Sequence, residues 1–462
     1  MKIKNYRSQA LCIDAFETLP GQAWCLLGAN RSGIDRMFAL LSGERSPGND
    51  AGVVQPAERF GVMSFAAQQA RFEDELKKDD SDFLDRIDPG TSARQFLNAP
   101  EAHEDLIRAF DLDKALDLGY RQLSTGQSRK LLLLAQITQG KQGLLIQAPY
   151  EGLDTRGCRE LDRSLALCHE RGIQILVTVN NPEDIPAWAT HVGVLDQGRM
   201  VLSGTRETVL KDMGQIPGSP SDFNVSPEDL AASPATPPSV RELVRLENGS
   251  AGYGDTLVFT SVSLTMHTGD HTLVTGPNGC GKSTLLSVIT GDHPACYQNR
   301  LWLFGIRRGT GESIWDLKQN MGIVSPDLHR NYIVPGSTLD CVLSGLFDSI
   351  GLYTAPSAAD RETAMAWLDR INLARDARTP FRQLSYADQR LALIARSLIK
   401  LPPLLILDEP TQGLDKANRE AVLDFLSQVA RENLSTILYV SHRQDEYRDF
   451  FASRLDMGGM GG

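Results

Sequence analysis

The sequence predicts an α/β fold that is built twice in tandem, with a parallel sheet in each half. Matching blocks recur through its 462 residues at a nearly constant spacing, 248 residues between Gly28 and Gly276 and 261 residues between Ser124 and Ser385. Such a spacing is typical of an internal duplication. In both halves short apolar runs alternate with helical stretches, which indicates parallel strands joined by helices.

The expected elements follow the chain in order. A stretch rich in Pro, Ser and acidic residues separates the two copies and has the composition of a solvated linker. We therefore expect a first domain over 1–213, a linker over 214–239 and a second domain over 240–462. Apolar runs predict strands at Ala23–Leu27, Leu144–Ile146, His271–Thr275, Leu404–Leu407 and Thr436–Val440. Helices are expected from Leu285 onward and over Asn418–Arg431.

Composition places the chain among ordinary globular proteins, with 41% hydrophobic and 23% charged residues. The net charge of −11 argues against nucleic acid as a partner, because such binding relies on clustered Lys and Arg. Seven scattered cysteines without metal-ligand spacing favour a reduced, cytoplasmic environment. The longest apolar stretch, around Leu131–Ile137, is far shorter than the roughly 20 residues of a membrane span. We therefore expect a cytoplasmic chain that does not itself insert into a membrane.

A glycine-rich loop of the second half has the pattern G-x-x-x-x-G-K-[ST] between a strand and a helix. Its glycines allow backbone N–H groups to surround phosphate oxygens, and the helix adds its positive dipole end. Lys282 can reach the β- and γ-phosphates of ATP, and Ser283 can ligate Mg²⁺. The expected ATP-binding residues of the loop are Gly276, Pro277, Asn278, Gly279, Cys280, Gly281, Lys282, Ser283 and Thr284. The N–H groups and Lys282 would favour a reactive thiolate at Cys280. The alternative is that this position of the loop simply accepts any small residue.

Two adjacent acids end the apolar run LLILDEP at Leu404–Pro410. The strand places Asp408 at its tip, where a carboxylate can organise the ligands of Mg²⁺. The neighbouring Glu409 can polarise the attacking water. Such a pair alone is usually a solvated strand end, but behind a phosphate-binding loop it predicts ATP hydrolysis.

Together with LSTGQ (Leu123–Gln127), GLD (Gly413–Asp415) and VSH (Val440–His442), these motifs resemble those of ABC-type ATPases over nearly the whole chain. The resemblance implies two P-loop NTPase domains, each with a helical subdomain. It implies that Tyr253 stacks on adenine and that His442 contacts the γ-phosphate. It also implies that ATP is sandwiched between the P-loop of one half and the LSTGQ-type signature segment of the other, so a tandem chain can close on itself.

The first half departs from the family pattern at each phosphate-handling position. Ile34 and Asp35 stand where Lys and Ser/Thr belong, and Gln147 and Ala148 replace the Asp–Glu pair. The histidine position is Asn180. A carboxylate at Asp35 beside a triphosphate would cost about 4 kcal/mol at an effective dielectric of ~20. We therefore expect no hydrolysis at the P-loop of this half.

The signature segments differ in the opposite sense. The first half keeps LSTGQ, in which Ser124, Gly126 and Gln127 are the expected ATP contacts, whereas the second half has LSYAD. Asp388 of that segment is expected to point its carboxylate towards a phosphate. The intact P-loop would thus pair with the intact signature, which predicts one working and one dead ATP site. One departure lies in the working half, where Pro326 stands at the position of the family's loop Gln.

The stretch Gly291–Ser325 resembles more narrowly the ModF family of molybdenum-transport ATP-binding proteins, tandem ABC proteins without a membrane domain of their own. This resemblance implies an energising subunit of a transport system, with molybdate as the suggested substrate. Membrane permease subunits are then the partners, and the chain is peripheral on the inner face of the plasma membrane. No residue of the sequence by itself indicates molybdate.

Two alternatives to transport remain. A non-transport ATP switch would act in repair, in regulation or at the ribosome. Ribosome-acting relatives typically carry two intact P-loops and a basic linker, whereas this chain has one intact P-loop and an acidic linker. A nucleotide sensor without turnover is disfavoured because Glu409 and His442 are both present.

Overall fold

The computed structural model describes residues 1–8, 11–45, 52–56, 58–78, 88–213, 242–253 and 256–458. The expected linker over 214–239 lies outside the described residues, as do residues 240 and 241 of the expected second domain. By its internal contacts the chain divides into two compact units. The first unit comprises Met1–Ser219 with Gly413–Lys416, and the second comprises Pro220–Gln412 with Ala417–Gly462.

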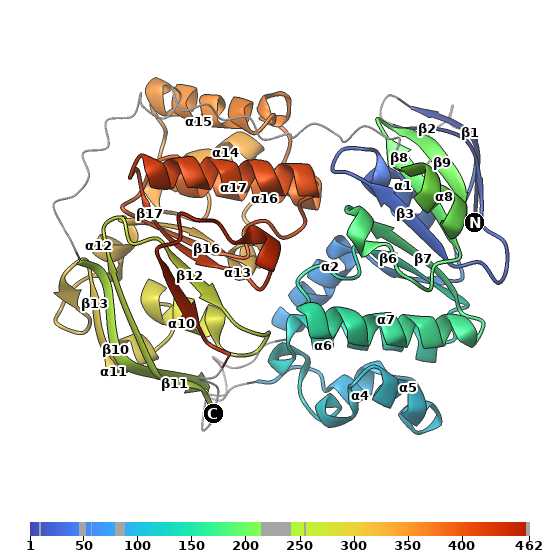
Figure 1. Ribbon diagram of the computed structural model, residues 1–462, viewed down its shortest axis with the longest axis horizontal. Helices are drawn as coiled ribbons and strands as arrows, with labels where there is room; N and C mark the ends of the chain where they lie inside the picture. Colours follow the sequence, from blue (N-terminus) through green and yellow to red (C-terminus); the bar gives the residue numbers. More distant parts are fainter. Residues whose placement is uncertain are drawn as a thin grey trace. The chain divides into compact units, whose positions relative to one another are not determined.

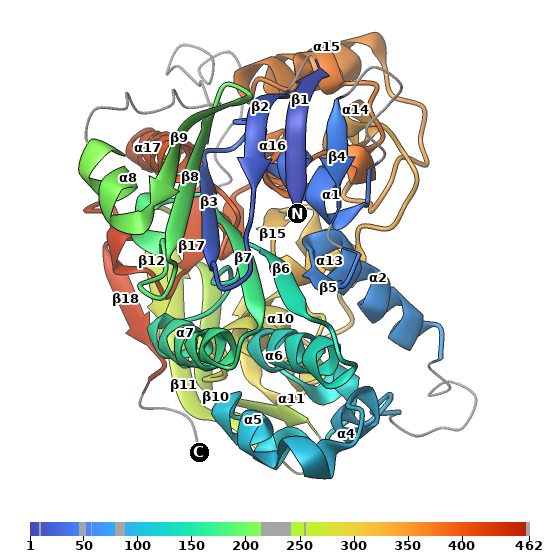
Figure 2. The ribbon, with the colours of Figure 1, turned by 90° about the vertical axis from the view of Figure 1, so that its right-hand side faces the viewer.

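The first unit is organised around one nine-stranded sheet. Its strands are β1 (Lys2–Ser8), β2 (Leu11–Glu17), β3 (Trp24–Gly28), β4 (Val53–Gln55), β5 (Phe60–Met63), β6 (Gly143–Gln147), β7 (Gln174–Val179), β8 (His191–Asp196) and β9 (Arg199–Thr205). They lie in the order β4-β1-β2-β9-β8-β3-β7-β6-β5. The part from β8 to β5 is parallel, whereas β1 pairs antiparallel with β2 and β4. Figure 2 shows β1, β2 and β4 side by side at one edge.

The helices of the first unit connect these strands. They are α1 (Ile34–Ser42), α2 (Phe65–Leu76), α4 (Ala93–Phe96), α5 (Glu104–Ala109), α6 (Thr125–Thr138), α7 (Thr155–Glu170) and α8 (Arg206–Asp212), with 3-10 turns η1 (Pro100–His103), η2 (Asp113–Ala115), η3 (Tyr120–Gln122) and η4 (Pro182–Asp184). Helix α7 shows why such segments fold as helices: Asp154 caps it by accepting from the N–H of Gly157 at 2.7 Å. Its buried residues Leu161, Leu165 and Cys168 recur at helical spacing and face the sheet core.

The second unit contains two sheets. Its strands are β10 (Glu242–Tyr253), β11 (Thr256–His267), β12 (Thr272–Thr275), β13 (Arg300–Leu303), β14 (Ile306–Arg307), β15 (Met321–Val324), β16 (Leu404–Asp408), β17 (Thr436–Val440) and β18 (Ser453–Asp456). A parallel sheet has the order β15-β16-β17-β12-β18, and an antiparallel sheet has the order β11-β10-β13-β14. The parallel sheet repeats the arrangement β5-β6-β7-β3-β8 of the first unit, as a duplication requires.

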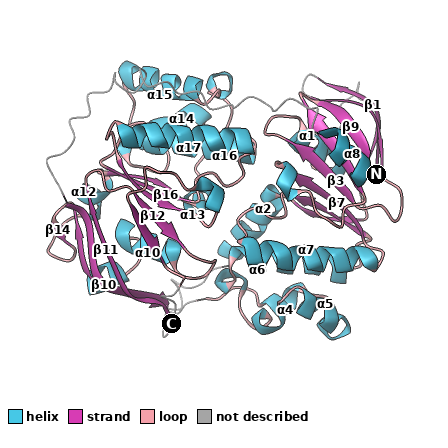
Figure 3. Cartoon of the chain, viewed as in Figure 1, coloured by secondary structure: helices cyan, strands magenta, loops and turns pink. Residues whose placement is uncertain are grey.

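The helices of the second unit flank the parallel sheet and form a helical part at one end of it (Figures 1 and 3). They are α10 (Lys282–Thr290), α11 (Ala295–Gln298), α12 (Ile314–Lys318), α13 (Pro326–Asn331), α14 (Thr338–Ser344), α15 (Ala358–Arg370), α16 (Tyr386–Leu398) and α17 (Lys416–Arg431), with 3-10 turns η6 (Gly345–Phe347), η7 (Ala374–Asp376), η8 (Phe381–Gln383) and η9 (Gln444–Glu446). Figure 3 shows α10 on one side of the strands and α17 on the other. The helices α13 to α16 lie between β15 and β16 in the chain and correspond to the expected helical subdomain.

The predicted elements are confirmed where apolar runs were long, since β16, β17, α10 and α17 lie where the sequence placed them. The expected parallel sheet is present in both units, but it is accompanied by antiparallel strands that the apolar runs did not indicate. Strands such as β10 alternate buried and half-buried or exposed residues rather than forming a continuous apolar run. Antiparallel strands with one face towards the core have this pattern, which a search for apolar runs does not detect.

Candidate functional site

The glycine loop of the second unit joins the end of β12 to the start of α10. Gly276, Gly279 and Gly281 have φ angles of 148°, 81° and 96°, values that residues with side chains rarely adopt. A Cβ atom at Gly281 would also lie 2.8 Å from Cγ1 of Val258. Glycine at these positions therefore permits the sharp curl that a phosphate-binding loop requires.

Lys282 opens α10 and is buried, with 6% of its surface exposed. Its ammonium group donates to the carbonyl oxygens of Gly276 at 2.8 Å and Pro277 at 2.9 Å. The cation thus lies against the beginning of its own loop, where it can contact an anion that enters the loop. Thr284 is buried two residues further along the helix.

Cys280 packs inside the loop with 9% of its surface exposed. A Cβ atom at Gly276 would lie 2.6 Å from its sulfur. Burial raises the pKa of the Cys280 thiol above its ordinary value and outweighs the opposing influence of Lys282 and the loop N–H groups. Of the two alternatives, the reactive thiolate is therefore wrong, because desolvation of the anion costs more than the nearby positive charge returns.

Ser283 and Asp408 form the polar contact between the loop and the sheet. The hydroxyl of Ser283 donates to Oδ2 of Asp408 at 2.8 Å. Asp408 ends β16, whose five residues are all buried. Burial, followed by the charge of Glu409, raises the pKa of Asp408 to about 7. A buried carboxylate beside a hydroxyl is a donor set that fits a hard divalent cation such as Mg²⁺.

This donor set is small. In the part of the chain that the structure describes, no group of three or more His, Cys, Asp or Glu side chains could hold a metal ion. Mg²⁺ usually takes only one or two carboxylates and completes its octahedron with water and substrate phosphates. The two oxygens therefore suit a cation that arrives with a nucleotide rather than a permanently bound metal.

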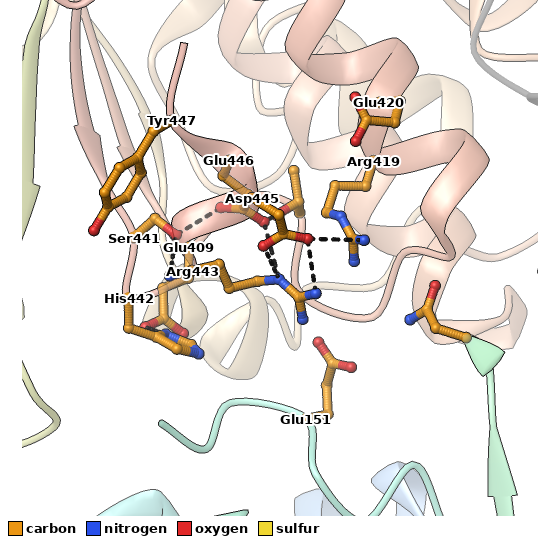
Figure 4. Close-up of polar contacts among 12 residues, drawn as sticks. Glu151, Glu409, Arg419, Glu420, Ser441, His442, Arg443, Asp445, Glu446 and Tyr447 are labelled. Atoms are coloured by element: carbon orange, nitrogen blue, oxygen red, sulfur yellow. Dashed lines mark hydrogen bonds and ion pairs between the residues drawn. The ribbon is translucent and has the colours of Figure 1, made fainter. Parts of the chain in front are cut away.

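Glu409 follows β16, His442 follows β17, and their side chains lie within hydrogen-bonding distance of each other. The separation of Glu409 Oε1 and His442 Nδ1 is 2.7 Å (Figure 4). Their side chains are only 16% and 15% exposed. Glu409 has a φ of 46°, a conformation that costs an ordinary residue about 1 kcal/mol or more and is often found at functional sites.

Each partner shifts the proton affinity of the other. Burial would raise the pKa of Glu409, but the hydrogen bond and charge of His442 outweigh it and hold this pKa below its ordinary value. Burial would likewise lower the pKa of His442, but the hydrogen bond and charge of Glu409 raise it. The pair therefore favours an ionised carboxylate, as a general base requires.

Arg390 of α16 holds the loops of this site, although sequence reasoning missed it. Its fully buried guanidinium donates to the carbonyl oxygens of Ser325 at 3.2 Å, Glu409 at 2.6 Å and Pro410 at 3.1 Å. The corresponding residue of the first unit is also an arginine, Arg129, five residues after the signature serine. That recurrence is a signal from which the position could have been found.

The segment that lacks the family's Gln forms a short helix. Pro326 begins α13, and Ser325 caps it by accepting from the N–H three residues on at 3.0 Å. His329 of this helix contacts α16: its Nε2 lies 2.8 Å from Oε1 of Gln389, and its ring stacks on Tyr386 with centroids 4.5 Å apart. Burial lowers the pKa of His329 to about 3, so its ring is neutral.

The first unit keeps the loop backbone while it loses the chemistry. Gly33 caps α1 with a φ of 95°, compared with 96° for Gly281. Ala148 has a φ of 44°, close to the 46° of Glu409, but carries no carboxylate. Ile34, at the position of the P-loop lysine, is 2% exposed and belongs to the hydrophobic core.

A different polar pair replaces the Ser283–Asp408 contact in the first unit. The amide of Gln147 donates to Oδ1 of Asp35 at 2.9 Å. The acid now belongs to the loop and the neutral donor to the strand, so donor and acceptor have exchanged places. The Asp35 carboxylate therefore has a hydrogen-bond donor within its own unit.

The two signature segments begin helices with the same serine cap. Ser124 accepts from the N–H of Gln127 at 3.2 Å, and the Gln127 side chain accepts from the N–H of Ser124 at 3.0 Å, with Gly126 between them. In the second unit the hydroxyl of Ser385 donates to Oδ2 of Asp388 at 2.8 Å. The Asp388 carboxylate thus lies at the start of its own helix, beside the signature serine, and the expectation that it points towards a phosphate stays a prediction.

The remaining expected site residue, Tyr253, ends β10 with 61% of its surface exposed. Its ring meets His293 edge to face, with centroids 5.1 Å apart. An exposed aromatic ring offers a face for stacking, and the structure neither adds to nor removes from that expectation. Within the described ranges, no helix is both long and apolar enough to cross a membrane.

Comparisons with known proteins agree with this geometry. The model of the family described as ABC transporter matches residues 259–412. The ABC transporter ATP-binding protein ModF of Escherichia coli is 35% identical over 455 residues, which cover 96% of this chain and 92% of ModF. The molybdate import ATP-binding protein MolC of Haemophilus influenzae is 31% identical over 192 residues, or 42% of this chain and 69% of MolC.

A solved structure of RNase-L Inhibitor matches the whole chain in fold. It covers 100% of this chain and 90% of that one, with a TM-score of 0.54 and 16% sequence identity. At that identity the likeness concerns the fold alone. It supports two nucleotide-binding cassettes in one chain.

Proposed function

The chain belongs to the ABC ATPase family, as a tandem ATP-hydrolysing protein similar to ModF over most of its length, and from that premise we propose which residues turn over ATP. The observation that carries the proposal is the arrangement within the second unit. There the P-loop serine bonds to the β16 aspartate, and the next residue, a glutamate, bonds to a histidine. The proposed catalytic residues are Glu409, His442 and Lys282.

Phosphate binding is assigned to the glycine loop and Lys282. The carbonyl oxygens that now accept from the Lys282 ammonium lie at the first two residues of the loop. A triphosphate bound there would replace them as the stronger partner, because charge-assisted hydrogen bonds exceed neutral ones. Ser283 and Asp408 would hold Mg²⁺, which supplies charge neutralisation for the phosphates.

Glu409 is proposed as the group that orients and deprotonates the attacking water. Its carboxylate is half-buried, ionised and held by His442, so its position is defined before substrate binds. His442 in turn would offer its other ring nitrogen to a γ-phosphate oxygen. The corresponding residues of the first unit, Ala148 and Asn180, can do neither.

We assign the signature contacts of the working site to Ser124, Gly126 and Gln127 of the first unit. This assignment rests on the family resemblance and on the distribution of intact motifs between the two halves. The P-loop of the first unit has an acid, Asp35, where a metal-binding hydroxyl belongs. One composite site for hydrolysis is the consequence.

The work done by this turnover is proposed to be transport. ATP binding and release would change the affinity of the two halves for each other, and a partner that senses that change would be driven through a cycle. The similarity to the ABC transporter ATP-binding protein ModF supports a transport role, and the name of MolC supports molybdate import. The chain would then work with a permease and lie peripherally on the membrane. An ATP switch in repair, regulation or translation is the alternative.

The decisive experiment compares wild-type protein with Glu409→Gln. Substitution of the base should abolish turnover while ATP still binds, and Lys282→Ala should weaken binding itself. Affinity purification of Glu409→Gln from detergent-treated membranes with Mg-ATP should then enrich permease subunits. Ribosomes or repair proteins in their place would favour the alternative, and ATP turnover by Glu409→Gln would refute the assignment of the base.

A further inference from the structure

The second unit contains a buried carboxylate that the proposed chemistry does not use. Glu446 is 1% exposed and ends the turn η9, four residues after His442. Three hydroxyl groups donate to it. Tyr439 donates to Oε2 at 3.0 Å, Ser441 donates to Oε2 at 2.7 Å, and Thr411 donates to Oε1.

Two of these donors lie in the loops that carry the reacting groups, and the third, Tyr439, lies in β17. Thr411 lies two residues after Glu409, and Ser441 immediately precedes His442. A single carboxylate therefore joins the loop after β16 to the end of β17, and Figure 4 shows its contact with Ser441. Movement of either loop would take at least one of the three donors away from this buried carboxylate, which is costly.

We propose that Glu446 is a positioning residue for ATP hydrolysis, which holds Glu409 and His442 at their mutual distance by tying Thr411 to Ser441. This inference rests on the proposed role of Glu409 as the base. A carboxylate suits the task because it only accepts hydrogen bonds and can take all three hydroxyls at once. A glutamine side chain in its place would present an amide donor to at least one of these hydroxyls.

The first unit provides an internal comparison. The residues that correspond to Thr411, Tyr439 and Ser441 are Tyr150, Val177 and Val179. Two of these have no hydroxyl, and the hydroxyl of Tyr150 donates to Asp162 instead. The position of Glu446 is kept as an acid, Asp184 at the end of η4, which accepts from the Asn181 amide at 3.2 Å. The same fold thus forms without the three hydroxyl donors in the unit that lacks the counterparts of Glu409 and His442. Their presence therefore follows the catalytic pair and not the sheet.

Other contacts hold the same turn to α17 and to Arg443, the residue that follows His442. Asp445 pairs with Arg419 of α17 and with Arg443, both at 3.1 Å (Figure 4). Arg448 pairs with Glu420 of α17 at 2.5 Å. Since Glu420 touches the segment but not the loops, Glu420→Gln is a matched control for general loosening of this region.

The test measures kcat, KM for ATP and the stoichiometry of ATP binding in the full chain. Glu446→Gln should lower kcat about 10- to 100-fold, the loss expected when a reacting group is misplaced by about 1 Å. The KM for ATP should stay within about threefold of the wild-type value, and the variant should bind ATP with the wild-type stoichiometry. Thr411→Val should lower kcat in the same direction, and Thr411→Ser should recover it relative to valine. Glu420→Gln should retain the wild-type kcat.

Three outcomes separate this inference from the proposed function. If Glu446→Gln and Thr411→Val both turn over ATP within about twofold of wild type, the positioning role is wrong. It is equally wrong if the loss appears as a lower binding stoichiometry or is shared by Glu420→Gln, because those results indicate unfolding. If Glu409→Gln still hydrolyses ATP, the assignment of the base fails instead. Should Glu446→Gln not fold, the Thr411 pair decides the question.

Discussion

The Asp35–Gln147 pair permits a sharp test of why the first unit tolerates its altered loop. Gln147→Asp would replace the amide that donates to Asp35 with a second carboxylate. The variant restores the aspartate that ends the equivalent strand of the second unit. However, it does so opposite another acid instead of opposite a serine.

The magnitude follows from the geometry. The two groups are now 2.9 Å apart, and two carboxylates would settle at roughly 4 Å, where like charges repel by about 4 kcal/mol at an effective dielectric of ~20. Both side chains are half-buried, so solvent reduces this repulsion to about 2 kcal/mol, and the lost hydrogen bond adds about 1 kcal/mol. The variant should therefore destabilise the first unit by about 3 kcal/mol at pH 8.

The effect should depend on pH with a definite sign. Repulsion raises the pKa of the acidic pair in the folded state above its unfolded value near 4. The folded state then binds more protons, so stability is lost as pH rises through the raised pKa and is recovered in acid. Destabilisation should be largest at pH 8 and small near pH 4.

Hydrogen exchange of peptides from β3 and β6 in the full chain reports the stability of this unit. The double variant Asp35→Ser with Gln147→Asp recreates the serine–aspartate pair and should recover most of the loss. A single variant within about 0.5 kcal/mol of wild type at pH 8 would refute the estimate, since coupled neighbours normally exceed that value. A double variant no more stable than the single one would show that the two side chains do not interact.

Further predictions concern the signature, the loop cysteine and a buried histidine. Ser124→Arg should lower kcat more than tenfold and Ser385→Arg much less, and equal losses in a steady-state ATPase assay would contradict one working site. Maleimide at pH 7 should label Cys280 more slowly than the half-exposed Cys12, because burial raises the pKa of the Cys280 thiol. Peptide mapping follows the two labels, and faster labelling of Cys280 would contradict the prediction. Burial lowers the pKa of His329 to about 3, so the unfolded chain takes up a proton on this ring below pH 6.5 before the folded chain does. The free energy of unfolding of the second unit should therefore fall by about 2 kcal/mol between pH 7 and pH 5. Denaturant unfolding of His329→Gln should lack this fall.

Much of the fold and of the ATP site can be predicted from local sequence patterns, each of which spans only a few residues. The P-loop follows from spaced glycines and a Lys–Ser pair, and its curl depends on backbone freedom at Gly276, Gly279 and Gly281. The strand β16 follows from a continuous apolar run. The duplication and the uneven distribution of intact motifs are likewise visible in the order of residues alone, because each motif is a contiguous segment.

Only the tertiary structure decides which side chains contact each other and how their pKa values shift. Asp408 meets Ser283 from 125 residues away, and no local pattern states which acid a hydroxyl will reach. A thiolate at Cys280 was one of two alternatives and does not form, because burial is a property of the whole packed unit. Glu446 reads in the sequence as one more acid of a charged surface segment. Its role depends on the fold, which brings hydroxyl groups from the loop after β16 and from the end of β17 around it and excludes water. Without water to replace them, these hydroxyl groups define where the carboxylate lies.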